Sequence, residues 1–274
     1  MTGESPESDQ QLDISKNDVS SFIEEKYIDQ SRNVNNNGGK ISTKRRKSKR
    51  HGARNQHRHK YFCKWIMENF NLKEGDLILD IAGGKGELAA RLSICHKLNV
   101  LMVDPRPADI QKTFESLVLP KLPKRHQLRM TERQKVEPTF LKTVFQERFR
   151  QIETLFDEYL IDTNEEVREA LEKCSLIIGL HADGATESIV NVALEHNKPF
   201  VVVPCCVFPN LFNQRFLYNQ YNNMDSSSSS NKPIPVRTHE QFCQYLLAKD
   251  ECLQHCTLPF EGRNFAIYWT QNQM

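Results

Sequence analysis

One stretch, residues 77–104, most constrains what this chain can fold into. It starts with an apolar run ending in Asp80, passes through a glycine-rich turn at 82–86, and ends in a second apolar run before Asp104. This order predicts a strand, a turn, a helix and a strand, with an acidic residue at the end of each strand. Glycines let a ligand approach the backbone closely, and a helix N-terminus attracts negative groups. The stretch therefore predicts a nucleotide-type ligand across the carboxyl edge of a parallel sheet.

Regular alternation of strands and helices continues after an interruption. Buried strands are predicted at 176–180 and 200–203, helices at 187–196 and 239–249, and a terminal hairpin at 253–258 and 265–269. Between them, residues 141–159 have an amphipathic helical pattern, and only 143–145 is a weak candidate for a third strand. Strands that alternate with helices and end in a hairpin predict an α/β fold with a mostly parallel sheet and one reversed strand.

Charge and composition divide the chain. Residues 1–39 carry eight acids against three basic residues, whereas 40–60 carry ten Lys or Arg and no acid. We expect a disordered tail over 1–57 (acidic 1–39, basic 40–57), a folded domain over 58–274 with an insertion around 108–175, and a flexible loop at 219–232. The basic block is typical of a nuclear-import signal or of an arm that binds RNA phosphates, and a merely solvated tail is the third alternative.

Several classes of protein are excluded at this point. No apolar run reaches the ~20 residues that span a bilayer, so no membrane segment is predicted. The acidic, polar start resembles neither a secretory signal nor a transit peptide. The eight cysteines lie without a C-x-x-C pair, which suits reduced thiols in an intracellular protein of the nucleus or cytoplasm.

The glycine-rich turn alone leaves the cofactor open. Its sequence satisfies G-x-G-x-x-A, and Asp104 follows at the distance expected for a ribose-binding acid, a pattern that permits NAD. Asp80, however, lies immediately before the turn, where its carboxylate would repel a pyrophosphate and attract a cation such as the amine of S-adenosylmethionine. The chain also lacks a second mononucleotide-binding half. These features favour S-adenosylmethionine.

These residues resemble those of class I S-adenosylmethionine-dependent methyltransferases. Residues 79–86 look like their first motif, with Ala82 in place of the commonest first glycine, and Val103-Asp104 looks like their second. The resemblance covers roughly residues 61–271 and implies a Rossmann-like, seven-stranded sheet with an antiparallel last strand. The cofactor-binding residues that it implies are Asp80, Ala82, Gly83, Gly84, Gly86 and Asp104.

A second pattern is more distinctive. Residues 179–186, GLHADGAT, followed by 203–206, VPCC, are similar to the GLHxCGxxT…PCC pattern of a eukaryotic methyltransferase-domain group that includes a transfer-RNA ribose methyltransferase. Asp183 stands where many of these proteins have cysteine. His181 and Asp183 should lie near the methyl acceptor, with His181 as general base or positioning group and Asp183 orienting it or contacting the acceptor. The alternative is that both cap the helix that begins near Thr186.

Cys205 and Cys206 are expected at the edge of the acceptor pocket. Structural zinc sites usually have C-x₂₋₄-C spacing, which this pair lacks, so we predict packing there and no metal site, with zinc ligation or a nucleophilic thiol as alternatives. Arg263 and Asn264 in the terminal hairpin are candidates for substrate contacts, although a hairpin turn would also explain them.

RNA, possibly tRNA, is the predicted methyl acceptor and partner. The basic 40–60 block and the 105–150 segment, with eleven Lys or Arg against five acids, support it. A protein or small-molecule acceptor, a non-catalytic binding module with a methyltransferase fold, and an NAD-dependent oxidoreductase stay open as alternatives.

Overall fold

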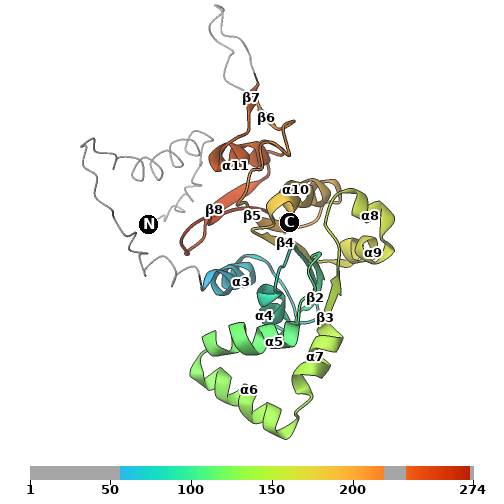
Figure 1. Cartoon of the computed structure of the whole chain (residues 1–274), viewed down its shortest axis with the longest axis vertical. Coiled ribbons are helices and arrows are strands. Elements are labelled where there is room, and N and C mark those ends of the chain that lie inside the picture. The colour runs from blue at the N-terminus through green and yellow to red at the C-terminus, as the bar shows by residue number, and fades with distance from the viewer. Residues whose placement is uncertain (1–55, 219–232, 272–274) are drawn as a thin grey trace, which may run out of the picture. The chain divides into compact units, whose positions relative to one another are not determined.

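The computed structural model describes residues 56–218 and 233–271 and is built on a seven-stranded sheet (Figure 1). Its strands lie in the order β3-β2-β1-β4-β5-β9-β8. All neighbours pair in parallel except β9, which is antiparallel to both β5 and β8. The strands are β1 (Leu77–Ile81), β2 (Asn99–Val103), β3 (Phe149–Ile152), β4 (Leu176–Leu180), β5 (Phe200–Val203), β8 (Gln254–Thr257) and β9 (Phe265–Trp269). The predicted α/β class, the reversed strand and the hairpin are confirmed.

Strand register brings the predicted site segments to one edge of the sheet. Ile81 at the end of β1 pairs with Val103 at the end of β2, and Leu180 at the end of β4 pairs with Val203 at the end of β5. The glycine-rich turn, Asp104, His181 and the Pro204-Cys205-Cys206 segment therefore all follow carboxyl ends of neighbouring parallel strands. This is where ligands of open α/β sheets bind.

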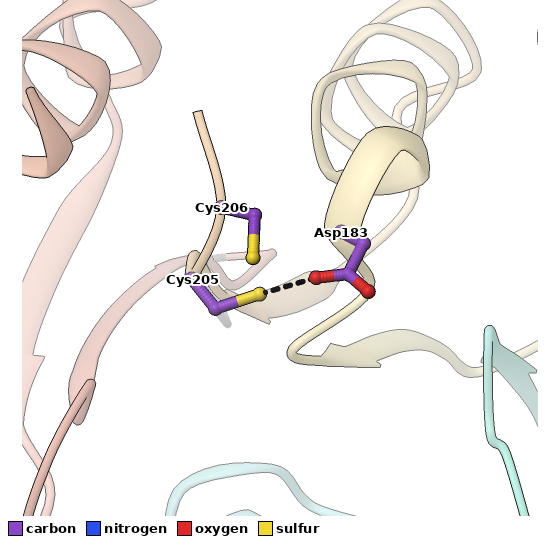
Figure 2. Close-up of side chains that lie close together, drawn as sticks. All are labelled: Asp183, Cys205 and Cys206. Atoms are coloured by element: carbon purple, nitrogen blue, oxygen red, sulfur yellow. Dashed lines mark hydrogen bonds between the residues drawn. The ribbon is translucent and has the colours of Figure 1, made fainter. Parts of the chain in front are cut away.

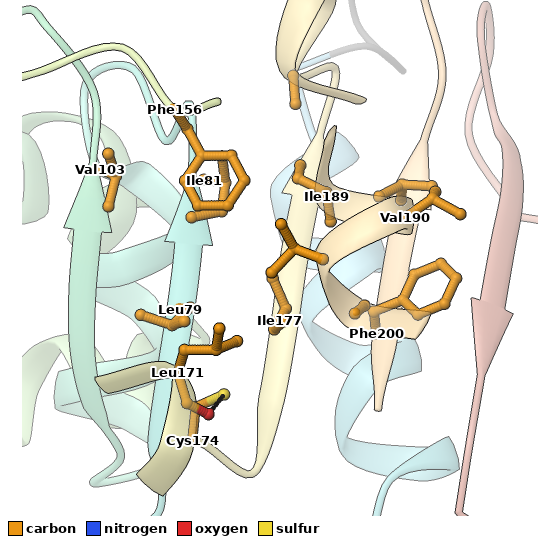
Figure 3. Close-up of a cluster of buried hydrophobic side chains, with 14 of the residues drawn as sticks. Leu79, Ile81, Val103, Phe156, Leu171, Cys174, Ile177, Ile189, Val190 and Phe200 are labelled. Carbon is orange, nitrogen blue, oxygen red and sulfur yellow. Dashed lines mark hydrogen bonds between the residues drawn. The ribbon is translucent and has the colours of Figure 1, made fainter. Parts of the chain in front are cut away.

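Helices cover both faces because alternate strand residues are apolar on each side. One face packs on α3 (Arg58–Asn69) and α4 (Glu87–Cys95). The other packs on α9 (Glu165–Lys173), α10 (Thr186–Glu195) and α11 (His239–Leu247). Figure 3 shows this second core, in which Leu79 and Ile177 of the sheet lie among Leu171, Ile189 and Phe200.

The predicted insertion contains its own small core and one strand of the main sheet. After β2 come α5 (Ile110–Thr113), a π-helical turn (Phe114–Val118), a 3₁₀ turn (Leu119–Lys121), α6 (Lys124–Val136) and α7 (Phe140–Arg148). The chain then enters β3, so the helix predicted over 141–159 was wrong beyond the end of α7. The strand candidate at 143–145 was also wrong, because these residues lie inside α7. α8 (Tyr159–Thr163) follows. Apolar residues of α7 pack on α4, and this burial gives α7 its helical periodicity.

Two short strands, β6 (Phe216–Leu217) and β7 (Ile234–Pro235), form an antiparallel pair that the sequence did not predict. They flank residues 219–232, so the predicted flexible loop, like residues 1–55 of the predicted tail, lies outside the described residues. None of the described helices is both long and apolar enough to span a membrane.

Candidate active site

The turn after β1 leaves no room for side chains between it and the strands. A Cβ on Gly83 would lie 2.7 Å from the Asp80 carboxylate and 2.6 Å from the buried Met102 sulfur. Ala82 adopts a left-handed conformation with φ of 56°, which glycine tolerates better, and its N–H donates to the Val103 carbonyl. The backbone of the turn is therefore held directly against the ends of β1 and β2.

Asp80 is a buried carboxylate that lacks a full set of partners. Its side chain is 2% exposed, and its Oδ2 atom has no hydrogen-bond partner in the described part of the chain. Burial, with a smaller contribution from the charge of Asp104, raises the pKa of Asp80 to about 7. A buried, unsatisfied carboxylate costs free energy unless a cation or donor completes it. The site therefore fits an ammonium group beside the glycine-rich turn.

Asp104 is already hydrogen-bonded within the chain. Its Oδ2 accepts from the Gly84 N–H at 2.8 Å, and both its oxygens accept from the Arg106 guanidinium at 3.0 and 3.1 Å. Burial alone would raise the pKa of Asp104, but Arg106 and the Gly84 N–H lower it below its usual value. The Arg106 side chain is 74% exposed, so a diol can displace it from Asp104 at little cost.

The raised pKa of Asp80 predicts that the affinity for the cofactor depends on pH. Below pH 7 the cofactor-free protein carries a proton on Asp80, and an ammonium ligand requires the carboxylate. We expect the affinity for S-adenosylmethionine to fall by about tenfold per pH unit as the pH drops below 7. Calorimetry at pH 6 in buffers of different ionisation enthalpy should detect release of a proton on binding. Binding with no proton release at pH 6 would show that Asp80 does not meet a cation.

The segment after β4 places two candidate side chains on strained backbone. His181 and Asp183 have φ values of 58° and 48°, in the left-handed region that non-glycine residues rarely adopt. The Nε2 atom of His181 lies 2.8 Å from the Arg263 carbonyl oxygen, and its ring contacts the Phe260 ring edge-on. Burial lowers the pKa of His181. Strain at a strand end with a defined partner is typical of a functional site.

Asp183 lies with the two cysteines that follow β5 (Figure 2). The Cys205 thiol donates to Asp183 Oδ1 at 2.9 Å, and the three ligand atoms of Asp183, Cys205 and Cys206 all lie within 4.8 Å of one another. Burial and the Asp183 carboxylate raise the pKa of Cys205, and Asp183 is the main cause of the raised pKa of Cys206. The helix-cap alternative was wrong for Asp183, because α10 has no side-chain cap and Asp183 gives only its carbonyl to Thr186 Oγ1.

The two hairpin candidates have different roles. The Arg263 carbonyl contacts His181, which ties the β8–β9 connection to the segment after β4. The Asn264 amide donates to the carbonyls of Leu258 and Phe260 at 2.8 and 2.5 Å, so it stabilises the turn. A direct substrate contact by either side chain stays a prediction.

A buried ion-pair network supports this edge, and sequence reasoning missed it. Arg215 is 2% exposed, and its Nε donates to Glu187 at 2.6 Å while its Nη1 donates to the Val207 carbonyl. Its guanidinium lies over the Phe212 ring, and Glu187 also accepts from the Tyr245 hydroxyl. The network anchors the segment after Cys206 to the start of α10. Only a single Arg, between Gln214 and Phe216, marks it in the sequence, so no periodic signal could have found it.

Comparison with known proteins now identifies the family. A family described as a methyltransferase domain matches residues 27–208. The chain belongs to this family of methyltransferase domains. The methyltransferase resemblance drawn from the turn and Asp104 is confirmed at the level of this family. No curated protein matches the chain.

Solved structures resemble the chain distantly. The methyltransferase domain of bacterial CtHen1 is 12% identical over 79% of this chain and 99% of its own, with a TM-score of 0.42. The ribosomal protein L11 methylase from Lactobacillus delbrueckii subsp. bulgaricus is 12% identical over 79% and 80%, with a TM-score of 0.38. A mutant of MtNAS in complex with S-adenosylmethionine is 12% identical over 77% of this chain and only 60% of its own, with a TM-score of 0.36.

Proposed function

We propose that this chain is an S-adenosylmethionine-dependent methyltransferase that acts on RNA. The observation that carries the catalytic part is the shared sheet edge, where a buried carboxylate lacking a partner at Asp80 and the strained His181 segment follow neighbouring strands. Asp80 and the turn at 82–86 would hold the methionine end of the cofactor, and Asp104 the ribose. When bound, the cofactor supplies an electrophilic methyl group on a sulfonium, and the protein aligns the acceptor with it and excludes water.

His181 is the group that would take the acceptor proton. A carbonyl oxygen can only accept, so the contact with Arg263 places the proton of the neutral imidazole on Nε2. Nδ1 then has a lone pair, which is what a general base requires. Asp183 hydrogen-bonds to Cys205, so the Arg263 carbonyl, rather than Asp183, orients His181.

Replacing His181 with asparagine tests this role. Asparagine tolerates the left-handed backbone at this position, so the variant should fold. We expect methyl transfer to fall by about 10²- to 10⁴-fold, with the affinity for S-adenosylmethionine, measured by calorimetry, unchanged. His255→Asn, which removes a histidine that stacks on Phe265 in the hairpin, is the matched control. Equal activity in both variants would contradict a base at His181. If the unmodified protein binds the cofactor but transfers no methyl group, the non-catalytic binding module is favoured.

RNA is supported as the acceptor by α6. Each of its Lys and Arg residues is exposed, and the helix buries none of its residues in the domain. They are Lys124, Arg125, Arg129, Arg133 and Lys135. In Figure 1 the helix lies beyond α5 and α7, away from the sheet. A helix with this many exposed cations suits a polyanion, because phosphate contacts release counterions from the RNA.

Charge reversal on this helix tests the acceptor class. We expect Arg125→Glu with Arg129→Glu to weaken binding of total cellular RNA by about tenfold or more at 0.1 M salt, and to reduce the salt dependence of binding. Filter binding and crosslinking with sequencing would measure both, alongside a deletion of 40–60. Lys173→Glu on α9, an exposed site that pairs with Glu169, is the control. Absence of RNA enrichment by the unmodified protein would redirect the search to protein or metabolite acceptors.

A further inference from the structure

Three potential metal ligands lie close together beside the segment that follows β4 and contains His181. Asp183 comes from the turn after β4, and Cys205 and Cys206 from the segment after β5, so two strand ends supply them. Their ligand atoms lie within 4.8 Å of one another, and in Figure 2 both sulfurs lie on the side that faces Asp183. Among the described residues this is the one group of three or more metal-ligating side chains that lies this close together.

We propose that Asp183, Cys205 and Cys206 bind one thiophilic divalent cation, for which Zn²⁺ is the probe. Two thiolates and a carboxylate are ligands that zinc accepts, with Zn–S distances of about 2.3 Å and Zn–O of about 2.0–2.2 Å. These bond lengths put the sulfur and oxygen of a tetrahedral site about 3.6 Å apart. The Cys205 Sγ and Asp183 Oδ1 atoms, now 2.9 Å apart, would therefore separate slightly on binding, and all three ligand atoms already lie within 4.8 Å of one another. On binding, two metal–sulfur bonds and one metal–oxygen bond form, both S–H bonds break, and the two protons pass to solvent.

The hydrogen bond between Cys205 and Asp183 supports this assignment. A thiol proton now bridges sulfur and oxygen at 2.9 Å, and a cation that displaces this proton would bind the same two atoms once side-chain rotation moves them apart.

Three protein ligands leave the fourth tetrahedral position open, as in catalytic zinc sites. Asp183 and Cys206 are exposed, so an incoming molecule can reach that position. A metal there would polarise or hold an acceptor atom next to His181. This last step rests on the proposed methyl transfer, whereas metal binding itself does not.

The adjacent cysteines explain why sequence spacing did not predict the site. Zinc patterns are recognised by cysteines two to four residues apart, and that spacing occurs at Cys252 and Cys256, with His255 between them. In the structure, those residues form no group that meets the same 4.8 Å criterion. At the Cys205-Cys206 pair, the third ligand comes from a different strand end, which only the sheet register brings close.

Zinc binding by the full chain, measured without S-adenosylmethionine, tests the proposal. The protein is stripped with chelator under reducing conditions and titrated with Zn²⁺ against a chromophoric competitor. It is separately titrated with Co²⁺, whose thiolate charge-transfer bands report sulfur ligation. We expect one tightly bound ion per chain, and these bands on cobalt binding.

Variants locate the site. Cys206→Ser and Asp183→Asn should each weaken zinc binding by about tenfold or more, and Cys206→Ser should also diminish the cobalt bands. Cys252→Ser, which removes an exposed thiol beside Asp250, should bind zinc as the unmodified chain does. Near-ultraviolet circular dichroism confirms folding of each variant. Absence of stoichiometric zinc in the unmodified chain would overturn the metal site. So would zinc binding by Asp183→Asn and Cys206→Ser that is as tight as that of the unmodified chain. Both results hold whatever the outcome of the methyl-transfer assays.

Discussion

Asp80→Asn is expected to weaken binding of S-adenosylmethionine by about 10- to 100-fold, and to make the cofactor-free protein more stable above pH 7. The loss of affinity follows from removing the charge that meets the ligand ammonium. The gain in stability follows because the folded protein holds Asp80 at a pKa of about 7, well above the 3.8 of an exposed aspartate. Between these values the folded state binds more protons than the unfolded state, so its stability falls as the pH rises from 4 to 7.

The loss of stability from this one group is on the order of 4 kcal/mol across that window, and asparagine should abolish it. Urea denaturation at pH 5 and pH 8, with and without S-adenosylmethionine, measures both effects. Asp76→Asn, in the turn before β1, is the control, because asparagine can still accept the Lys73 N–H. A loss of cofactor affinity together with a gain in stability in Asp80→Asn distinguishes a ligand-binding carboxylate from a structural one. A variant that is destabilised in the absence of cofactor would assign Asp80 a structural role.

Glu187→Ala should destabilise the protein by about 3–5 kcal/mol, because it leaves the guanidinium of Arg215 buried without its counterion. Arg215 has no route to solvent, since its side chain is 1% exposed and lies over the rings of Phe212 and Phe242. The Lys249 ammonium and the Tyr245 hydroxyl also lose their shared acceptor. We expect faster proteolysis near residues 207–217 and reduced methyl transfer, because that segment continues from Cys205 and Cys206.

An exposed ion pair provides the comparison. Glu169 and Lys173 on α9 lie 2.8 Å apart, as close as the Lys249–Glu187 pair, but in solvent. Glu169→Ala should therefore change the free energy of unfolding, measured in urea, by about 0.5 kcal/mol or less. If the two substitutions have similar effects, burial does not determine the strength of the Glu187 network.

Sequence pattern was sufficient for most of the sheet. Apolar runs at 176–180 and 200–203 predicted β4 and β5 at their observed bounds. The Asp80–turn–Asp104 constellation is local in sequence, and a strand, turn and strand fix its geometry. Its assembly at one sheet edge therefore followed from the sequence alone.

Pattern failed where packing between distant segments decides the structure. β3 has only four residues, and its polar members at the sheet margin hide its alternation, so these residues were included in the middle of the helical pattern predicted over 141–159. The contact between Asp183 and Cys205 joins residues 22 apart and depends on the register of β4 with β5. Arg106 could have been suspected, because it stands two residues after Asp104.

Glu87, the first residue of α4, shows why the domain cannot be reduced to a minimal sheet and helices. Its carboxylate pairs with His59 of α3 at 3.2 Å and with Lys121 of the inserted segment at 2.8 Å. Burial would raise the pKa of Glu87, but these two partners lower it to about 2. A version of the protein shortened by removing the segment between β2 and β3 would leave this acid underneutralised directly after the cofactor turn. The inserted segment therefore stabilises the region around the glycine-rich turn. A truncated protein that omits it should bind the cofactor more weakly even where its sheet still folds.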